Sequence, residues 1–191
     1  MKLFLVRHGQ SESNLSQTYT GQSDVSLTET GRKEAEAIRP ILAEFTFDRV
    51  YSSDLRRAMD TQKLALPGME AQTTPLLREY ALGSLVGQSI AEVRKKWGAQ
   101  ISKTRDYTPF GGESSEDVQR RLREFLAMLE ADPCEYVAAF AHGGIMSTML
   151  RIVLGVDYDR TTVRNGNCAI HVFDYDGTKW RLLAWNYKGH I

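Results

Sequence analysis

The sequence predicts an α/β protein: a three-layer α/β/α sandwich with a mostly parallel central sheet and an antiparallel element. Short apolar runs alternate along the chain with longer segments whose apolar residues recur at helical spacing. The last two apolar runs follow each other directly and are joined by Asp176-Gly177, a pair typical of a β-hairpin. No repeat or Pro/Ser-rich linker divides the 191 residues, so we expect a single domain over residues 1–191.

The predicted strands are short apolar runs bounded by charged or turn-forming residues. The first, residues 2–6, ends abruptly at Arg7 and has the pattern of a buried strand. The run at residues 136–140 is the best candidate for a fully buried strand. The remaining predicted strands are residues 49–52, 73–77, 168–174 and 179–186.

The predicted helices follow from apolar residues that recur every three or four positions. The first begins at about Thr28, with Thr28 or Ser26 as its cap, and carries its apolar stripe as far as Phe45. A long helix over residues 115–131 has a continuous apolar stripe. The others are predicted at residues 55–65, 89–97 and 144–154.

Charge and composition exclude several classes of protein. The 24 basic side chains balance 24 acidic ones, so the chain lacks the positive field that a nucleic-acid-coating or polybasic membrane-binding protein needs. The first apolar run is too short for a signal peptide, and no run is long enough to cross a bilayer. We therefore expect a cytoplasmic protein with no nucleic-acid or membrane partner. Cys134 and Cys168 are predicted to be reduced and buried.

Polar residues follow four of the predicted strands directly. Parallel sheets bind ligands beyond the carboxyl ends of their strands, so these residues are expected to share one edge. They are Arg7-His8-Gly9, then Ser52-Ser53 leading to Arg56-Arg57, then Arg78-Glu79, then His142-Gly143-Gly144. The sequence thus directs two histidines, at least two arginines and a carboxylate to one edge.

This combination suits phosphoryl chemistry. Arginines bind phosphate oxygens bidentately and keep their charge, and a neutral histidine can attack phosphorus. Glu79 is the only carboxylate at the end of a predicted strand that could protonate the leaving oxygen. The sequence contains no metal-ligand pattern, so we expect no metal and no cofactor.

These residues also carry a resemblance to the histidine phosphatase superfamily, the phosphoglycerate mutase-like proteins. Its ordered motifs extend over essentially the whole chain: 5–14 (LVRHGQSESN), Thr20-Gly21, 52–61 (SSDLRRAMDT), Leu77-Arg78-Glu79, Gly112-Glu113-Ser114 and 141–144 (AHGG). The resemblance implies His8 as the phosphorylated nucleophile and Glu79 as the proton donor. It implies Arg7, Arg57 and His142 as the phosphate pocket, with Arg57 preferred over Arg56 because it directly precedes the alanine of the family pattern. Asn14, Thr20, Gly21 and Gly143 match positions that line the substrate.

Departures from the family bear on the substrate. Mutases of the superfamily resemble one another in an Arg-His-Tyr triplet after the glutamate and in a basic insertion, both of which grip a second acidic group. This chain has Tyr80-Ala81-Leu82 and no long insertion, which favours hydrolysis of a small phosphorylated substrate. Leu85-Val86 stands where many phosphatases have an aromatic and an acidic residue, and it predicts a more apolar wall. A phosphoglycerate mutase and a non-catalytic phosphate-binding module are the alternatives.

Other charged and titratable residues have simpler interpretations. Arg94, Lys95 and Lys96, with Lys103 and Arg105, are interpreted as a solvated face. His171 and His190 lie away from the predicted edge and are given no role. The sequence leaves the oligomeric state open, with a homodimer as one alternative.

Overall fold

The computed structural model describes residues 1–98, 105–132, 134–156 and 163–187. Its strands form a six-stranded sheet in the order β3-β2-β4-β1-β5-β6. Strands β1 to β4 are parallel neighbours, whereas β5 runs antiparallel to β1 and β6 antiparallel to β5. Their bounds are β1 Lys2–Arg7, β2 Arg49–Ser53, β3 Gln72–Thr74, β4 Tyr136–Ala141, β5 Ile170–Tyr175 and β6 Trp180–Tyr187. The mixed sheet confirms the predicted fold class.

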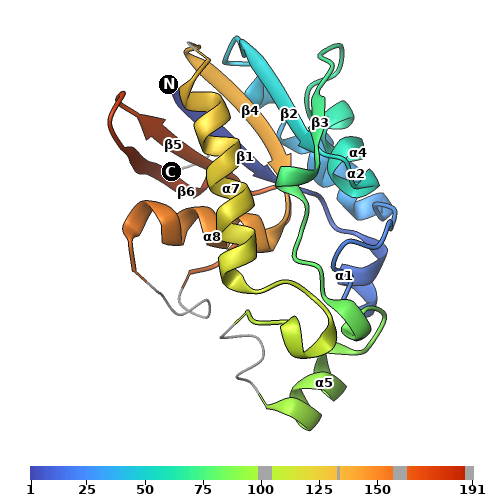
Figure 1. Ribbon diagram of the computed structural model, residues 1–191. Helices are drawn as coiled ribbons and strands as arrows, with labels where there is room; N and C mark the ends of the chain where they lie inside the picture. The colour runs from blue at the N-terminus through green and yellow to red at the C-terminus, as the bar shows by residue number, and fades with distance from the viewer. Residues whose placement is uncertain (99–104, 133, 157–162, 188–191) are drawn as a thin grey trace.

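Helices cover both faces of this sheet (Figure 1). The α-helices are α1 Glu12–Ser16, α2 Glu29–Ala37, α3 Arg39–Leu42, α4 Arg56–Ala65, α5 Ile90–Trp97, α7 Ser115–Glu130 and α8 Gly143–Leu154. Short 3-10 helices occur at Pro75–Leu77, Gly83–Leu85 and Thr108–Phe110. In the parts of the chain that the structure describes, none of the helices combines the length and apolar character that crossing a bilayer needs.

Two apolar cores, one on each face of the sheet, hold the layers together. Alternate strand residues point to opposite faces, so Leu3 and Leu5 join the α7 and α8 side while Phe4 and Val6 join the α2, α3 and α4 side. Strands β1 and β4 supply buried residues to both cores, which explains why their sequences are continuously apolar. The carboxyl ends of β1, β2 and β4 are thereby fixed side by side.

Proline explains two differences from the predicted elements. The helix expected from Thr28 through Phe45 is divided at Ile38 into α2 and α3, with Pro40 in the first turn of α3. Proline lacks the N–H that a continuous helix would use there. The strand expected at residues 73–77 is shorter for the same reason, because β3 gives way to a 3-10 helix at Pro75. The predicted cap is confirmed, since Thr28 Oγ1 accepts a hydrogen bond from the N–H of Gly31 at 3.1 Å.

The chain after β1 passes very close to α2. A Cβ built on Gly9 would lie 2.3 Å from the carbonyl oxygen of Gly31, so no larger residue fits at position 9 without a shift. This close approach fixes the turn that follows His8. Helix α1, which was not predicted, continues that turn and is capped by Ser11 and Asn14. Both cysteines are free as predicted, but only Cys168 is buried; Cys134 is half-buried.

Candidate active site

A pocket of about 220 Å³ opens at the carboxyl ends of the parallel strands. It is lined by eight of the nine residues predicted for the site: Arg7, His8, Asn14, Thr20, Gly21, Arg57, Glu79 and Gly143. The ninth, His142, is fully buried, and its ring centroid lies 5.2 Å from that of His8. Residues that are far apart in sequence therefore meet in one small volume.

His8 is buried and held in one tautomer. Its Nδ1 lies 2.7 Å from the carbonyl oxygen of Gly9, which can only accept a hydrogen bond, so Nδ1 carries the proton. The lone pair is then on Nε2. Burial, followed by the positive charges of Arg57 and Arg7, lowers the pKa of His8 well below its usual value. His8 is therefore a neutral imidazole near neutral pH, the form that can act as a nucleophile.

Two of the three arginines that line the pocket, Arg57 and Arg7, are fixed by main-chain carbonyls. Arg57 donates to the carbonyl oxygens of Gly21 and Ser23, both at 2.8 Å, and is only 2% exposed. Burial lowers the pKa of Arg57 to about 10, which still leaves it cationic near neutral pH. Arg7 donates through Nη1 to the carbonyl oxygen of Asn165.

Arg56, the neighbour of Arg57, lies on the surface. It is exposed and pairs with Asp60 on the same helix at 3.6 Å. The structure thus places Arg57, and not Arg56, in the pocket, which agrees with the choice that the family resemblance implied.

Glu79 is oriented by the first turn of α8. Its Oε2 accepts a hydrogen bond from the N–H of Gly144 at 2.9 Å, and its Oε1 accepts one from the N–H of Tyr80 at 2.9 Å. Other carboxylates near the strand ends are engaged elsewhere, because Asp54 pairs with Arg78 and Glu113 pairs with Arg121. Glu79 is therefore the carboxylate that the fold presents to the pocket.

His142 lies behind His8, at the start of α8. Its Nε2 is 2.9 Å from Ser53 Oγ, whereas its buried Nδ1 has no hydrogen-bond partner among the described residues. Burial and the charge of Arg57 lower the pKa of His142 well below its usual value. One ring nitrogen is thus anchored on the end of β2, and the other is available to a ligand.

Asn165 and His171 support Arg7 and were not predicted. Besides accepting from Arg7, Asn165 accepts a hydrogen bond from His171 Nε2 at 3.1 Å and donates through Nδ2 to the carbonyl oxygen of Gly143 at 3.3 Å. His171, which the sequence left without a role, is fully buried, and burial lowers its pKa to about 3. The sequence did not point to Asn165 because β5 runs antiparallel to β1, so the residues before β5, and not those after it, reach this edge.

Two expectations from the sequence are wrong: that Arg105 lies on a solvated face, and that Leu85 and Val86 form an apolar wall of the pocket. Arg105, assigned to a solvated face, is 1% exposed and lines the pocket. Leu85 packs in the core and Val86 lies on the surface, so neither forms the apolar wall. The solvated interpretation holds for Arg94, Lys95 and Lys96, which are exposed on α5, while Lys103 and His190 lie outside the described residues.

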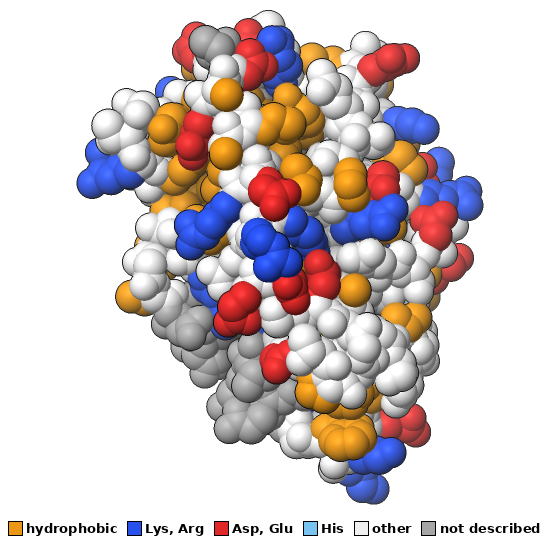
Figure 2. All heavy atoms as spheres, viewed as in Figure 1, with side chains coloured by type: hydrophobic (Ala, Val, Ile, Leu, Met, Phe, Trp, Pro, Cys, Tyr) orange, Lys and Arg blue, Asp and Glu red, His pale blue; other side chains and the backbone are white. Residues whose placement is uncertain are grey.

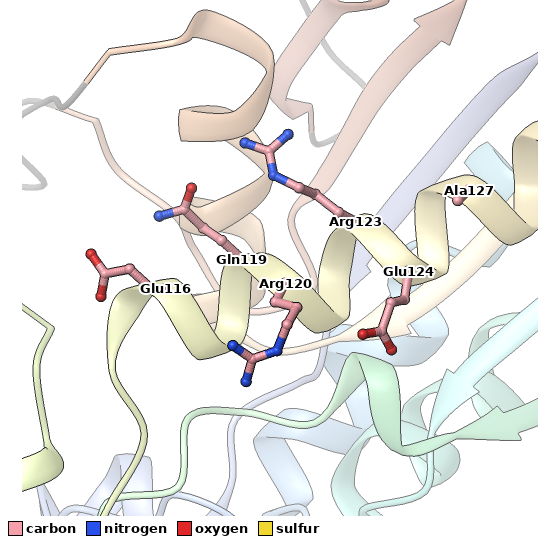
Figure 3. A pocket seen from close by; sticks show the side chains of 6 residues that line it. All are labelled: Glu116, Gln119, Arg120, Arg123, Glu124 and Ala127. Carbon is pink, nitrogen blue, oxygen red and sulfur yellow. The ribbon is translucent and has the colours of Figure 1, made fainter.

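A wider depression of about 540 Å³ lies on the outer face of α7 (Figure 3). It is lined by a single helix: Glu116, Gln119, Arg120, Arg123, Glu124 and Ala127. Its charged side chains point in different directions (Figure 3), and charges of both signs are interspersed across this face of the molecule (Figure 2). No converging set of groups distinguishes it, so we assign the site to the pocket at the strand ends.

These features define the class of the protein as an α/β protein in which a histidine, three arginines and a carboxylate line one pocket at the strand ends. The chain belongs to the histidine phosphatase superfamily (branch 1), whose family model matches residues 3–188. The prediction of a histidine-type phosphatase is thereby confirmed at the level of the family.

Relatives named as phosphatases and relatives named as phosphoglycerate mutases both match the chain. It is 32% identical to the glucosyl-3-phosphoglycerate phosphatase of Mycobacterium tuberculosis over 215 aligned positions, which cover 100% of this chain and 96% of that protein. It is 43% identical to the 2,3-bisphosphoglycerate-dependent phosphoglycerate mutase of Cytophaga hutchinsonii over 129 residues, 63% of this chain and 60% of that protein. A solved structure of mycobacterial glucosyl-3-phosphoglycerate phosphatase in complex with VO3 superposes with a TM-score of 0.86 at 31% identity, covering 97% of this chain and 98% of that one.

Proposed function

We propose that this protein hydrolyses phosphomonoesters of small metabolites and carries the phosphoryl group on His8 during turnover. One observation above all supports this: His8 is a buried, neutral imidazole whose Nδ1–H is held by Gly9, with Arg7 and Arg57 beside it. The free Nε2 is the nitrogen that attacks. The named phosphatase relatives support the same class of substrate.

In the first half of the reaction, His8 Nε2 forms a bond to phosphorus while the bond from phosphorus to the ester oxygen breaks. Arg7, Arg57 and His142 donate to the equatorial phosphoryl oxygens, where negative charge is spread in the transition state. Glu79 gives a proton to the departing alkoxide, so the alcohol leaves neutral. Asn14, Thr20, Gly21 and Gly143 line the remaining space.

In the second half, water attacks the phosphorus of phosphohistidine and the N–P bond breaks. The Glu79 carboxylate accepts a proton from that water, which regenerates the acid for the next turnover. The products are inorganic phosphate and neutral His8.

Acid-labile phosphate on His8 is the decisive test. Stopping the reaction during turnover and analysing peptides by mass should locate the phosphoryl group on the peptide that contains His8. The His8→Ala variant should lose nearly all activity and keep its circular dichroism spectrum. Label on a serine or aspartate instead would refute the mechanism.

The alternatives are a phosphoglycerate mutase and a phosphate-binding module that does not turn over. Relatives include proteins named for either enzyme activity. Residues 80–82 supply no cation after Glu79, which favours water as the acceptor. Incubation with 3-phosphoglycerate and a trace of 2,3-bisphosphoglycerate should release inorganic phosphate; 2-phosphoglycerate forming faster would favour the mutase. Failure to turn over any phosphomonoester would favour the binding module.

We also propose that the reaction needs no metal ion. In the described ranges, no group of three His, Cys, Asp or Glu side chains gathers as the ligands of one ion would. The arginine charges and the N–H donor of His142 then supply the electrostatic stabilisation. EDTA should leave the rate unchanged, and activity that EDTA abolishes and zinc or magnesium restores would contradict this.

A further inference from the structure

Glu113 and Arg121 form an ion pair next to the proposed acid, outside the groups that the proposed reaction uses. The pair is bidentate: Arg121 Nε donates to Glu113 Oε1 at 3.0 Å, and Arg121 Nη2 donates to Oε2 at 3.1 Å. Their side chains are only 14% and 22% exposed, so solvent and salt screen the two charges little. Neither is among the described residues that line the pocket, so the pair can influence the reaction only through other groups.

Arg121, on α7, spends its other donors on the chain that carries Glu79. Its Nη2 donates to the main-chain carbonyl oxygen of Glu79 at 3.1 Å, and its Nη1 donates to that of Leu76 at 2.8 Å. A guanidinium is planar and rigid, so these bonds and the two bonds to Glu113 share one fixed geometry. Arg121 therefore ties the backbone of the proposed acid to α7.

Glu113 holds the same segment two residues further along. Its Oε2 accepts a hydrogen bond from the N–H of Ala81 at 2.7 Å, and its own N–H donates to the carbonyl oxygen of Ala81 at 2.8 Å. Gly112 lies so close that a Cβ built on it would be 2.3 Å from that oxygen. The backbone on the carboxyl side of Glu79 is thus held by the carboxylate to which Arg121 is paired.

We propose that the Glu113–Arg121 pair positions Glu79 for proton transfer to the leaving oxygen. This inference rests on the proposed function, because it takes Glu79 as the acid. A carboxyl group must lie within roughly 2.6–3.2 Å of the atom that it protonates, so a small shift of its backbone takes it out of reach. The bonds from the N–H groups of Gly144 and Tyr80 orient the carboxylate, but they can form only where that backbone is in place.

The leaving group separates a positioning role from a merely structural one. The ratio kcat/KM covers the steps up to phosphohistidine, in which the acid assists an alkoxide but contributes little to the departure of p-nitrophenolate. We expect Arg121→Met to lose at least about tenfold more kcat/KM on glycerol 3-phosphate than on p-nitrophenyl phosphate. This excess is smaller than the roughly 10²- to 10⁴-fold effect of a general acid, because Gln22 Nε2 also donates to the carbonyl of Glu79, at 3.0 Å. Equal losses on the two esters would overturn the proposal.

Three further variants keep this test decisive. Glu113→Gln nearly preserves the shape of the side chain and should show the same preferential loss, which covers the case in which Arg121→Met does not fold. Arg121→Lys should recover part of the loss, because it returns the charge without the fork. Arg120→Met is the matched control, since Arg120 is 67% exposed and pairs with Asp117 on the same helix. It should leave the ratio between the two esters as it is in the parent. A folded Glu113→Gln variant with the parent's ratio would also overturn the proposal.

The amide signal of Gly144 in an NMR spectrum reports on Glu79 without turnover, since the N–H of Gly144 donates to Glu79 Oε2. In Arg121→Met its proton shift should move toward its value in Glu79→Ala, and in Arg120→Met it should stay in place. An unmoved signal in Arg121→Met, with preferential loss of the alkyl ester in Glu79→Gln, would refute the positioning role alone. A moved signal with equal losses in Glu79→Gln would instead refute Glu79 as the acid in the proposed function, and with it a role of the pair in proton transfer.

Discussion

Gly144 and Glu79 fit together so closely that no larger residue fits at position 144 unless the Glu79 carboxylate moves. The N–H of Gly144 donates to Glu79 Oε2 at 2.9 Å, and a Cβ built on Gly144 would lie 1.9 Å from Oε1 of the same carboxylate. A glycine in the first turn of a helix lowers its stability, yet here it makes room for the proposed acid.

Gly144→Ala should therefore displace Glu79 and lower kcat by roughly 10²- to 10⁴-fold, the range for losing a general acid. Steady-state kinetics on an alkyl phosphate would measure this. The control is the double variant Gly144→Ala/Glu79→Gln, which should be little slower than Glu79→Gln alone, because both changes remove the same function. Fully additive losses would show that Gly144 acts on something other than Glu79.

The leaving group should decide how much Glu79 matters. Glu79→Gln cannot deliver a proton, so we expect a loss of roughly 10²- to 10⁴-fold on an alkyl phosphate and a much smaller loss on p-nitrophenyl phosphate, whose leaving group departs with little protonation. Comparing kcat/KM for the two esters checks this. Equal losses would assign Glu79 a positioning role only.

Asn165 should set the affinity for the phosphoryl group through Arg7. Asn165→Ala removes the side-chain bonds to His171 and to the carbonyl of Gly143, and so loosens the carbonyl that Arg7 uses. We expect KM to rise about tenfold and vanadate inhibition to weaken by a similar factor, with a smaller change in kcat. Asn167→Ala, two residues further on, is the matched control. A fall in kcat with unchanged vanadate affinity would contradict this role.

Buried histidines should make stability depend on pH. Burial is the main cause that lowers the pKa values of His8, His142 and His171, so below about pH 6.5 the unfolded chain binds more protons than the folded one. The free energy of unfolding should then fall as the pH drops from 6.5 to 5, by up to about 1.4 kcal/mol per pH unit for each histidine, and stay level above about pH 7.

Urea unfolding at several pH values would measure that slope. The His171→Gln variant should show a shallower slope between pH 6.5 and 5, because one buried titrating group has been removed. An identical slope in both proteins would show that His171 is not a source of the pH dependence.

The sequence predicted the edge of the sheet because each parallel strand ends in the residues that the site needs. Arg7 and His8 lie at the end of β1 and His142 follows β4 directly, and the parallel order of β1, β2 and β4 brings these ends together. Glu79 follows the 3-10 helix after β3. The buried apolar runs and their order along the chain were therefore sufficient to predict this edge of the sheet.

Arg105 and Asn165 could not be predicted in this way. Arg105 belongs to an irregular segment with a left-handed backbone (φ 52°), where no periodicity tells which side chain points inward. Its charge resembled that of the solvated residues 94–96, and only the tertiary packing separates them. Asn165 precedes an antiparallel strand, so its position depended on knowing the direction of β5.

The antiparallel direction of β5 also places its two ends at opposite ends of the sheet, one near the pocket and one away from it. Ile170 pairs with Val6 near the pocket, whereas Asp174 pairs with Lys2, and Tyr175 donates its N–H to the carbonyl of Met1. The hairpin between β5 and β6 therefore lies beside the start of β1, at the opposite end of the sheet from the strand end that His8 follows. Figure 1 shows this hairpin on the side of the sheet where the chain begins. A fluorophore, an affinity tag or a tether to a solid support inserted at Gly177 would therefore sit at the end of the sheet opposite the pocket.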